Sequence, residues 1–377
     1  MRLYDTARRR VVPFEPSGRV TMYTCGITPY DSAHLGHASV YLVYDVLRRR
    51  LADMGLEVRC VRNVTDVDDD ILRKARELGV HYLDLAAEEM ARFDADMAAL
   101  GLLLPDAEPR ATSAIPDILS LVGAALDTGH AYRSSGGVYF DVTTFPEFGK
   151  VSHLTEDEML ALAAAHGGNP DDPAKRHPLD FVLWQPSLPD EPSWESRWGP
   201  GRPGWHVECS ALAMRELGPT VDLHGGGRDL VFPHHECENA QSEAVTGRRF
   251  VRHWLHGGLV GLGGEKMSKS LGNLVFVGDL MKEWEPAVVR VALLDHHYRQ
   301  DWDWEPAALE AAAERLDRWR RAPAASPDRR HAGRALELVR ARLDDDLDVP
   351  GALRGLDELA EDRAPVATGA ALLGVAL

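Results

Sequence analysis

The chain has 377 residues, 42 Lys and Arg against 59 Asp and Glu, a formal net charge of −17 at pH 7, and 45% hydrophobic residues. This length predicts about two or three domains of roughly 100–200 residues. The composition is that of an ordinary globular protein, and no apolar run approaches the roughly 20 residues of a membrane-spanning helix. Because no secretory signal follows the N-terminal Met, we expect a cytoplasmic protein without membrane contact.

The acidic balance disfavours proteins that bind nucleic acid mainly by neutralising phosphates. The four cysteines are at positions 25, 60, 209 and 237. They do not make a disulfide scaffold in a chain of this length. We therefore expect free thiols that can bind a metal or take part in chemistry.

The N-terminal part of the chain alternates between strand and helix patterns. Residues 20–27 and 58–64 are predicted strands, and helical periodicity covers residues 34–54 between them. Strand, helix and strand at this spacing are typical of a parallel, doubly wound α/β sheet. Ligands bind at the carboxyl ends of such strands, where Cys25 and Thr65 lie.

Residues 105–203 interrupt this alternation with Pro, Gly and Asp, which predicts an inserted subdomain with long ordered loops. The alternation resumes with predicted strands at 220–223 and 251–260 and a helix at 234–246. From residue 286, Ala- and Arg-rich helical patterns predict a helical C-terminal domain. The predicted boundaries are 1–104 for the first half of the α/β domain, 105–203 for the insertion, 204–285 for the second half of the α/β domain and 286–377 for the helical domain.

Two histidines, His34 and His37, lie at the start of the first predicted helix, directly after a strand. A helix N-terminus presents unpaired N–H groups and the positive end of the dipole, so it is a natural phosphate site. Gly36 between them allows a ligand to approach the backbone closely. Two surface histidines would explain the same pattern.

Two lysines, Lys266 and Lys269, belong to a KMSKS sequence flanked by glycines. On a mobile loop they can close over a polyanion and neutralise charge that develops in adenylyl transfer, and a solvated charged loop is the alternative. Together, the HLGH and KMSKS sequences resemble the two signatures of class I aminoacyl-tRNA synthetases. This resemblance implies a Rossmann-like α/β catalytic core of the HIGH/KMSKS type, with an inserted subdomain and a short helical C-terminal domain.

Four further residues, Cys25, Cys209, His234 and Glu238, are of types that bind metals. On the predicted helix, His234 and Glu238 are four residues apart and share one face. Two Cys, one His and one Glu form a set acceptable to Zn²⁺. Scattered buried cysteines and a helix-capping histidine pair are the alternative, because the four residues lie far apart in the sequence.

The resemblance becomes specific for the cysteinyl-tRNA synthetase superfamily and covers residues from about 20 to 300. The matching segments are CGITPYDSAHLGH (25–37), VRNVTDVDD (61–69), PLDFVLW (178–184), GRPGWHVECSA (201–211), HGGGRDLVFPHHE (224–236) and KMSKSLGN (266–273). It implies one zinc ion at Cys25, Cys209, His234 and Glu238 that binds the thiolate of substrate cysteine. Zinc prefers thiolate to hydroxyl, so it would separate cysteine from serine.

The resemblance also implies attack of the cysteine carboxylate on the α-phosphate of ATP, with Mg²⁺, to give cysteinyl-AMP. His34 and His37 would stabilise the phosphates, and Lys266 and Lys269 would neutralise the pyrophosphate. Residues that match the nucleotide and adenylate site are Gly26, Ile27, Thr28, Asn63, Thr65, Trp205, Gly225, Gly226, Gly227, Asp229 and Val260. Val260 is placed only by its strand end, and core packing explains it equally well.

Three acidic residues, Asp66, Asp68 and Asp69, follow the second predicted strand. They resemble a Mg²⁺ site, but carboxylates are also favoured at the start of a helix. We expect the helix-capping role.

Two branches of this superfamily share the activation chemistry and differ in the acceptor. One passes cysteine to tRNA, and the mycothiol-pathway ligases pass it to the amine of glucosaminyl-inositol. The proline of CGITPYD and the segments 165–180, 273–277 and 292–305 resemble the ligases. The length also leaves little room for an anticodon-reading tail. We therefore expect L-cysteine, ATP and the amino sugar as substrates of a monomer, with tRNA disfavoured.

One segment points to the other branch. HHECENAQSEAVTG (234–247), which contains Glu238, resembles the tRNA synthetases, because the ligases typically lack this carboxylate. A paralogue that serves another amine acceptor and a non-catalytic zinc-binding regulator are the remaining alternatives.

Overall fold

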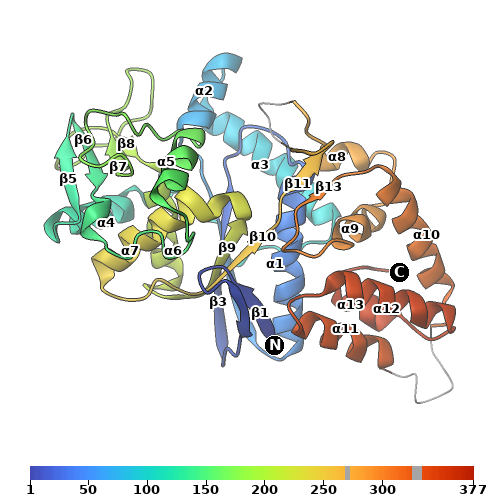
Figure 1. Ribbon diagram of the computed structural model, residues 1–377. Helices are drawn as coiled ribbons and strands as arrows, with labels where there is room; N and C mark the ends of the chain where they lie inside the picture. Colours follow the sequence, from blue (N-terminus) through green and yellow to red (C-terminus); the bar gives the residue numbers. More distant parts are fainter. Residues whose placement is uncertain (268–271, 325–332) are drawn as a thin grey trace.

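The structure is a computed structural model that describes residues 1–267, 272–324 and 333–377. At its centre is a four-stranded parallel sheet with the order β10–β9–β3–β4 (Figure 1). Its strands are β3 (Arg19–Ile27), β4 (Glu57–Val64), β9 (Val221–Gly227) and β10 (Val251–Gly257). This sheet confirms the predicted parallel α/β core.

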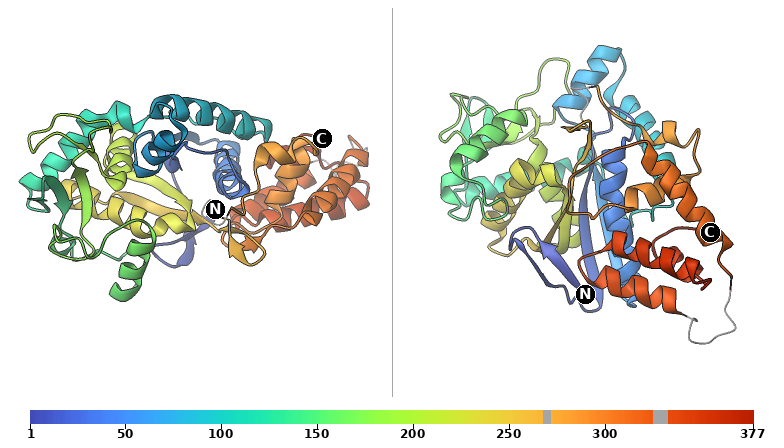
Figure 2. Two further views of the ribbon diagram at one scale, coloured as in Figure 1. Left: turned by 90° about the horizontal axis from the view of Figure 1, so that it is seen from above. Right: turned by 45° about the vertical axis from the view of Figure 1, so that its right-hand side comes forward.

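Helices cover both faces of the sheet, as a doubly wound fold requires (Figures 1 and 2). On one face Met22 of β3 packs in an apolar cluster with α1 (Leu35–Asp53) and helices from the C-terminal part. On the other face Tyr23, the next residue, packs with α6 (Trp205–Leu217) and α7 (Glu236–Thr246). Successive strand residues point to opposite faces, so β3 contributes to both cores.

The helix α2 (Asp69–Leu78) begins and ends at residues that its sequence specifies. Asp68 accepts a hydrogen bond from the Ile71 N–H at 2.9 Å, which confirms the predicted capping role for this residue. Asp66 instead accepts from the Thr112 N–H and hydroxyl, and Asp69 pairs with Arg202. The helix ends at Gly79, whose φ of 68° suits a residue without a Cβ.

An antiparallel sheet with the strand order β5–β6–β7–β8 lies beside the core (Figure 1). Its strands are β5 (Ala131–Ser134), β6 (Gly137–Phe140), β7 (Phe181–Gln185) and β8 (Arg202–Pro203). The helices α3 (Tyr82–Ala99), α4 (Ile115–Asp127) and α5 (Glu156–Ala165) belong to the same half of the chain. All four strands fall within residues 105–203, whereas the domain boundaries themselves stay a prediction.

One predicted strand of the second half is divided in the structure. Residues 251–260 were expected as one strand, but the chain leaves the central sheet after Gly257 because the Gly258 N–H donates to the Tyr298 carbonyl at 2.6 Å. Strand β11 (Val260–Leu262) then pairs with β12 (Glu265–Lys266) and β13 (Trp302–Asp303).

The C-terminal part is helical, as predicted, and packs against α1 (Figure 2). Its helices are α8 (Val277–Leu280), α9 (Pro286–Leu294), α10 (Ala307–Arg321), α11 (Arg334–Asp344), α12 (Val349–Glu361) and α13 (Ala367–Leu372), and a hairpin of β1 (Arg2–Asp5) and β2 (Arg10–Pro13) starts the chain. Arg50 of α1 pairs with Asp344, and buried Arg290 of α9 pairs with Asp45 of α1. None of the helices in the described part of the chain is long and apolar enough to cross a membrane.

Candidate active site

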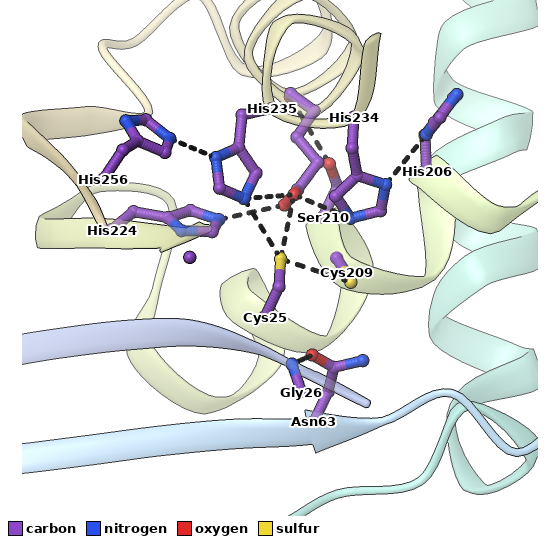
Figure 3. A network of polar contacts seen from close by, with 12 residues as sticks. Cys25, Gly26, Asn63, His206, Cys209, Ser210, His224, His234, His235 and His256 are labelled. Carbon is purple, nitrogen blue, oxygen red and sulfur yellow. Dashed lines mark hydrogen bonds and ion pairs between the residues drawn. The ribbon is translucent and has the colours of Figure 1, made fainter. Parts of the chain in front are cut away.

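Four buried side chains from separate segments meet at the carboxyl end of β3 (Figure 3). Cys25 Sγ lies 3.9 Å from Cys209 Sγ of α6 and 3.4 Å from Glu238 Oε1 of α7. His234 Nε2, in the turn before α7, lies 3.1 Å from Glu238 Oε1. The four ligand atoms all lie within 4.8 Å of one another. The structure therefore brings together the four predicted metal-binding residues in a cluster that can hold one ion.

Two further histidines share this cluster. His224 Nε2 lies 3.1 Å from Glu238 Oε2, and His235 Nε2 lies 3.3 Å from Cys25 Sγ. With Cys25 and Glu238 they form a second group of four ligand atoms within 4.8 Å. The other ring nitrogen of His235, Nδ1, lies 2.6 Å from Nε2 of His256 (Figure 3).

Neither His224 nor His235 was predicted from the sequence to be a metal ligand. The signal was present, since His224 directly precedes a predicted nucleotide-binding glycine and His235 directly follows a predicted ligand.

Opposite charges stabilise one another in this buried cluster. Burial alone would raise the pKa of Glu238, but His224 and His234 hold that pKa well below its usual range. Burial would lower the pKa of His234, but Cys209 and Glu238 raise it. The hydrogen bond with Cys25 lowers the pKa of the Cys209 thiol, whereas burial raises the pKa of Cys25 itself. Without a metal, the cluster therefore favours a thiolate at Cys209 beside an imidazolium at His234.

The first turn of α6 carries side chains next to this cluster. The Trp205 ring lies 4.1 Å from the His234 ring, centroid to centroid, and His206 Nδ1 lies 2.9 Å from His234 Nδ1. Glu208 is completely buried, and burial and the nearby Asp68 raise its pKa well above the usual range. The sequence analysis missed Glu208, although it directly precedes a predicted metal ligand.

The predicted nucleotide-site residues on β3 and β4 lie together at the ends of these strands. The Gly26 N–H donates to Asn63 Oδ1 at 2.8 Å (Figure 3). Asn63 Nδ2 donates to Thr65 Oγ1 at 3.1 Å. The Ile27 carbonyl accepts from the Thr65 N–H, and the Thr28 hydroxyl donates to Asp68 at 2.7 Å. A Cβ at Gly26 would lie 1.5 Å from the Asn63 carbonyl oxygen, so only glycine fits there.

The predicted site residues of β9 lie at the same edge of the sheet. Gly225, Gly226 and Gly227 form the end of β9, and Asp229 follows in a short 3-10 turn. Any Cβ at Gly225 would lie 1.7 Å from the Leu255 carbonyl oxygen of the neighbouring strand.

The first signature sequence contacts the segment that follows the second one. His34 caps α1 and accepts from the Gly36 N–H at 3.1 Å, and its ring lies 3.9 Å from the ring of His37. The Leu35 N–H donates to the carbonyl of Val275, which follows the KMSKS sequence, at 2.9 Å. The start of α1 and the segment after the loop are therefore side by side.

The loop itself is described only in part. Lys266 belongs to β12, and its backbone pairs with Gly261 of β11, while Lys269 lies outside the described residues. Val260 of β11 is buried in the core, and its carbonyl accepts from the Met267 N–H at 3.0 Å.

Comparisons with known proteins agree with this fold and site. Residues 11–314 match the family model for the catalytic domain of class I (C) tRNA synthetases. The methionyl-tRNA synthetase of Mycobacterium tuberculosis in complex with methionyl-adenylate superposes with a TM-score of 0.67 at 19% identity, over 92% of this chain and 82% of that chain. The chain therefore belongs to the class I (C) tRNA synthetase catalytic-domain family.

The curated relatives are more specific. The L-cysteine:1D-myo-inositol 2-amino-2-deoxy-alpha-D-glucopyranoside ligase of Acidothermus cellulolyticus is 50% identical over 94% of this chain and 88% of its own length. The protein of the same name from Thermobispora bispora is 47% identical over 100% of this chain and 96% of its own. The predicted resemblance to the cysteine-activating superfamily is thereby confirmed.

Proposed function

We propose that the protein is an ATP-dependent ligase that activates L-cysteine and joins it to the amine of glucosaminyl-inositol in mycothiol biosynthesis. One observation carries this proposal, namely 47–50% identity, over 94% or more of the chain, to ligases named for this reaction. The class I fold supports an activation step that consumes ATP and forms cysteinyl-AMP.

We propose Zn²⁺ as the metal at Cys25, Cys209, His234 and Glu238. In a tetrahedral site, Zn–S bonds of about 2.3 Å place two sulfurs about 3.8 Å apart, and bonds of about 2.0 Å to N and O place those atoms about 3.3 Å apart. The distances of 3.9 Å between the sulfurs and 3.1 Å between His234 and Glu238 fit these values. Zn²⁺ held there would bind the substrate thiolate in preference to a serine hydroxyl.

We propose the following roles for the remaining predicted residues. His34 and His37, at the N-terminus of α1, stabilise the phosphates while the cysteine carboxylate attacks the α-phosphate. Lys266 and Lys269 neutralise the leaving pyrophosphate. The residues at the ends of the central strands hold the adenylate and its nucleotide; they are Gly26, Ile27, Thr28, Asn63, Thr65, Trp205, Gly225, Gly226, Gly227, Asp229 and Val260.

Two assays test this proposal in sequence. Zinc-replete protein should catalyse cysteine-dependent ATP–pyrophosphate exchange, and absence of this exchange would end the enzyme hypothesis. The same protein is then given glucosaminyl-inositol and unmodified tRNA in separate reactions. Amide formation with the amino sugar is expected, whereas transfer to tRNA alone would identify a tRNA synthetase instead.

A further inference from the structure

Glu208 has an unusual environment for a carboxyl side chain. It lies in the first turn of α6, directly before Cys209, with 0% of its surface exposed. Neither carboxylate oxygen has a hydrogen-bond partner within the described ranges of the chain. An unpaired buried carboxylate is costly, and buried polar groups in native proteins are nearly always paired. A positively charged ligand would therefore supply the hydrogen-bond partner that Glu208 lacks.

The surroundings of Glu208 are negatively charged. Asp66 and Asp68 act on it electrostatically, and the nearby cation is Arg202. Arg202 is already paired, since its Nε lies 3.0 Å from Glu191 and its Nη2 contacts Asp69. Both aspartates also have their own partners, among them Thr112 for Asp66 and Thr28 for Asp68. Because Arg202 is held by Glu191 and Asp69, it is not free to pair with Glu208.

Substrate chemistry places a cation next to this carboxylate. In L-cysteine only two carbon atoms separate the ammonium nitrogen from the sulfur. If the substrate sulfur binds the metal that Cys25 and Cys209 hold, the ammonium group of the same molecule lies close to the first turn of α6. In this turn Glu208 lies between Trp205, which contacts the ring of His234, and the ligand Cys209.

We propose that Glu208 binds the α-ammonium group of L-cysteine. This inference rests on the proposed function, because it takes cysteine as the substrate. An ammonium group donates hydrogen bonds to the carboxylate and supplies the missing positive charge. A thiol that lacks the amine leaves Glu208 buried and unpaired, so the site rejects it. Glu208 thus adds selection for the amine to the selection for the thiol.

The test compares L-cysteine with 3-mercaptopropionate, which keeps the thiol and carboxylate and lacks the amine. ATP–pyrophosphate exchange gives KM and kcat for L-cysteine, and inhibition of that exchange gives the affinity for 3-mercaptopropionate. In Glu208→Gln we expect KM for L-cysteine to rise about 10- to 100-fold, the range of a charge-assisted hydrogen bond. The inhibition constant of 3-mercaptopropionate should stay within about twofold of the unmodified protein, as should the metal content.

The matched control is Glu216→Gln on the same helix, because Glu216 pairs with Arg59 and Arg215. It should leave both constants unchanged. Glu208→Asp keeps the carboxylate, so its affinity for L-cysteine should lie between those of Glu208→Gln and the unmodified protein. It is also the variant to measure if Glu208→Gln folds poorly.

Two results would overturn the inference, namely an equal loss of affinity for both thiols in Glu208→Gln and no loss for either. If the unmodified protein shows no cysteine-dependent exchange, the proposed function itself fails. If the unmodified protein does catalyse exchange and Glu208→Gln has the same KM for L-cysteine, only the role of Glu208 fails.

Discussion

Cys25 Sγ lies 3.4 Å from Glu238 Oε1, although 213 positions separate the two residues in the chain. Both belong to two overlapping groups of potential ligands, one completed by Cys209 and His234 and the other by His224 and His235. The first group contains two thiols, which favour zinc, and the second contains two imidazoles. The proposed function requires the first group to hold the metal. His224 and His235 then orient two of its ligands, Glu238 and Cys25.

Replacing the two adjacent histidines distinguishes these groups. His234→Asn removes a proposed ligand and should reduce bound zinc to well below one per chain. His235→Asn removes contacts to Cys25 and His256 but no ligand of the first group, so about one zinc should remain, with an affinity lowered roughly 10- to 100-fold. Metal analysis and competition with a chelator measure both quantities. The reverse order of effects would assign the metal to the second group.

Cys209→Ser should remove both the zinc and the discrimination against serine. A serine hydroxyl is a poor ligand for zinc at neutral pH, and the substrate thiolate then loses its binding position. Metal content and exchange with L-cysteine or L-serine are the measurements. Cys60→Ser is the control, because Cys60 is buried on β4 and belongs to neither group. Unchanged zinc in Cys209→Ser would contradict the proposed site.

His37→Asn should slow adenylation without changing the zinc content. His37 lies against His34 in the first turn of α1, where the proposed phosphate site is. Loss of one group that stabilises the transition state lowers kcat by roughly 100-fold or more. The exchange rate at saturating ATP and cysteine measures this effect. His130→Asn, at a histidine that contacts Thr144 outside the site, should exchange normally. An unchanged rate in His37→Asn would remove it from the phosphate site.

Periodicity was sufficient to predict the central sheet and its helices. The strand at 20–27 and the helix at 34–54 agree with β3 and α1 to within one residue, because apolar spacing and a capping residue specify them locally. Strand β9 is longer than predicted, since it continues through Gly225 to Gly227, which strand propensity disfavours. Gly225 is there because the Leu255 backbone of β10 and the Tyr44 hydroxyl leave no room for a Cβ.

The site was predictable only where a resemblance supplied the residues. Spacing within one helix related His234 to Glu238, but nothing local relates Cys25 to Cys209 across 184 positions. The contact of His224 with Glu238 joins β9 to α7, and the burial of Glu208 depends on the segments that pack against α6. Such contacts depend on tertiary structure, and a local pattern cannot specify them.

The contact between α1 and the C-terminal helices predicts a pH-dependent contribution to stability. Asp53, at the end of α1, accepts hydrogen bonds from Arg340 of α11 and from Arg50. Arg340 first, and Arg50 as well, lower the pKa of Asp53 below its ordinary value of 3.8. A carboxyl whose pKa is lower in the folded state stabilises the fold above the unfolded value, and this contribution is lost as the pH falls through the folded value.

Asp53→Asn should therefore lower the free energy of unfolding at pH 7 by about 1–2 kcal/mol, since the pair is partly exposed. The difference from the unmodified protein should shrink toward zero as the pH falls below 3.8, because Asp53 then becomes neutral in both states. Denaturant unfolding at several pH values measures this difference. Asp70→Asn, which removes an exposed pair with Arg73 within α2, should change stability by less than about 0.5 kcal/mol. A difference for Asp53→Asn that stays constant down to acidic pH would show that packing around the side chain, and not its charge, joins α11 to α1.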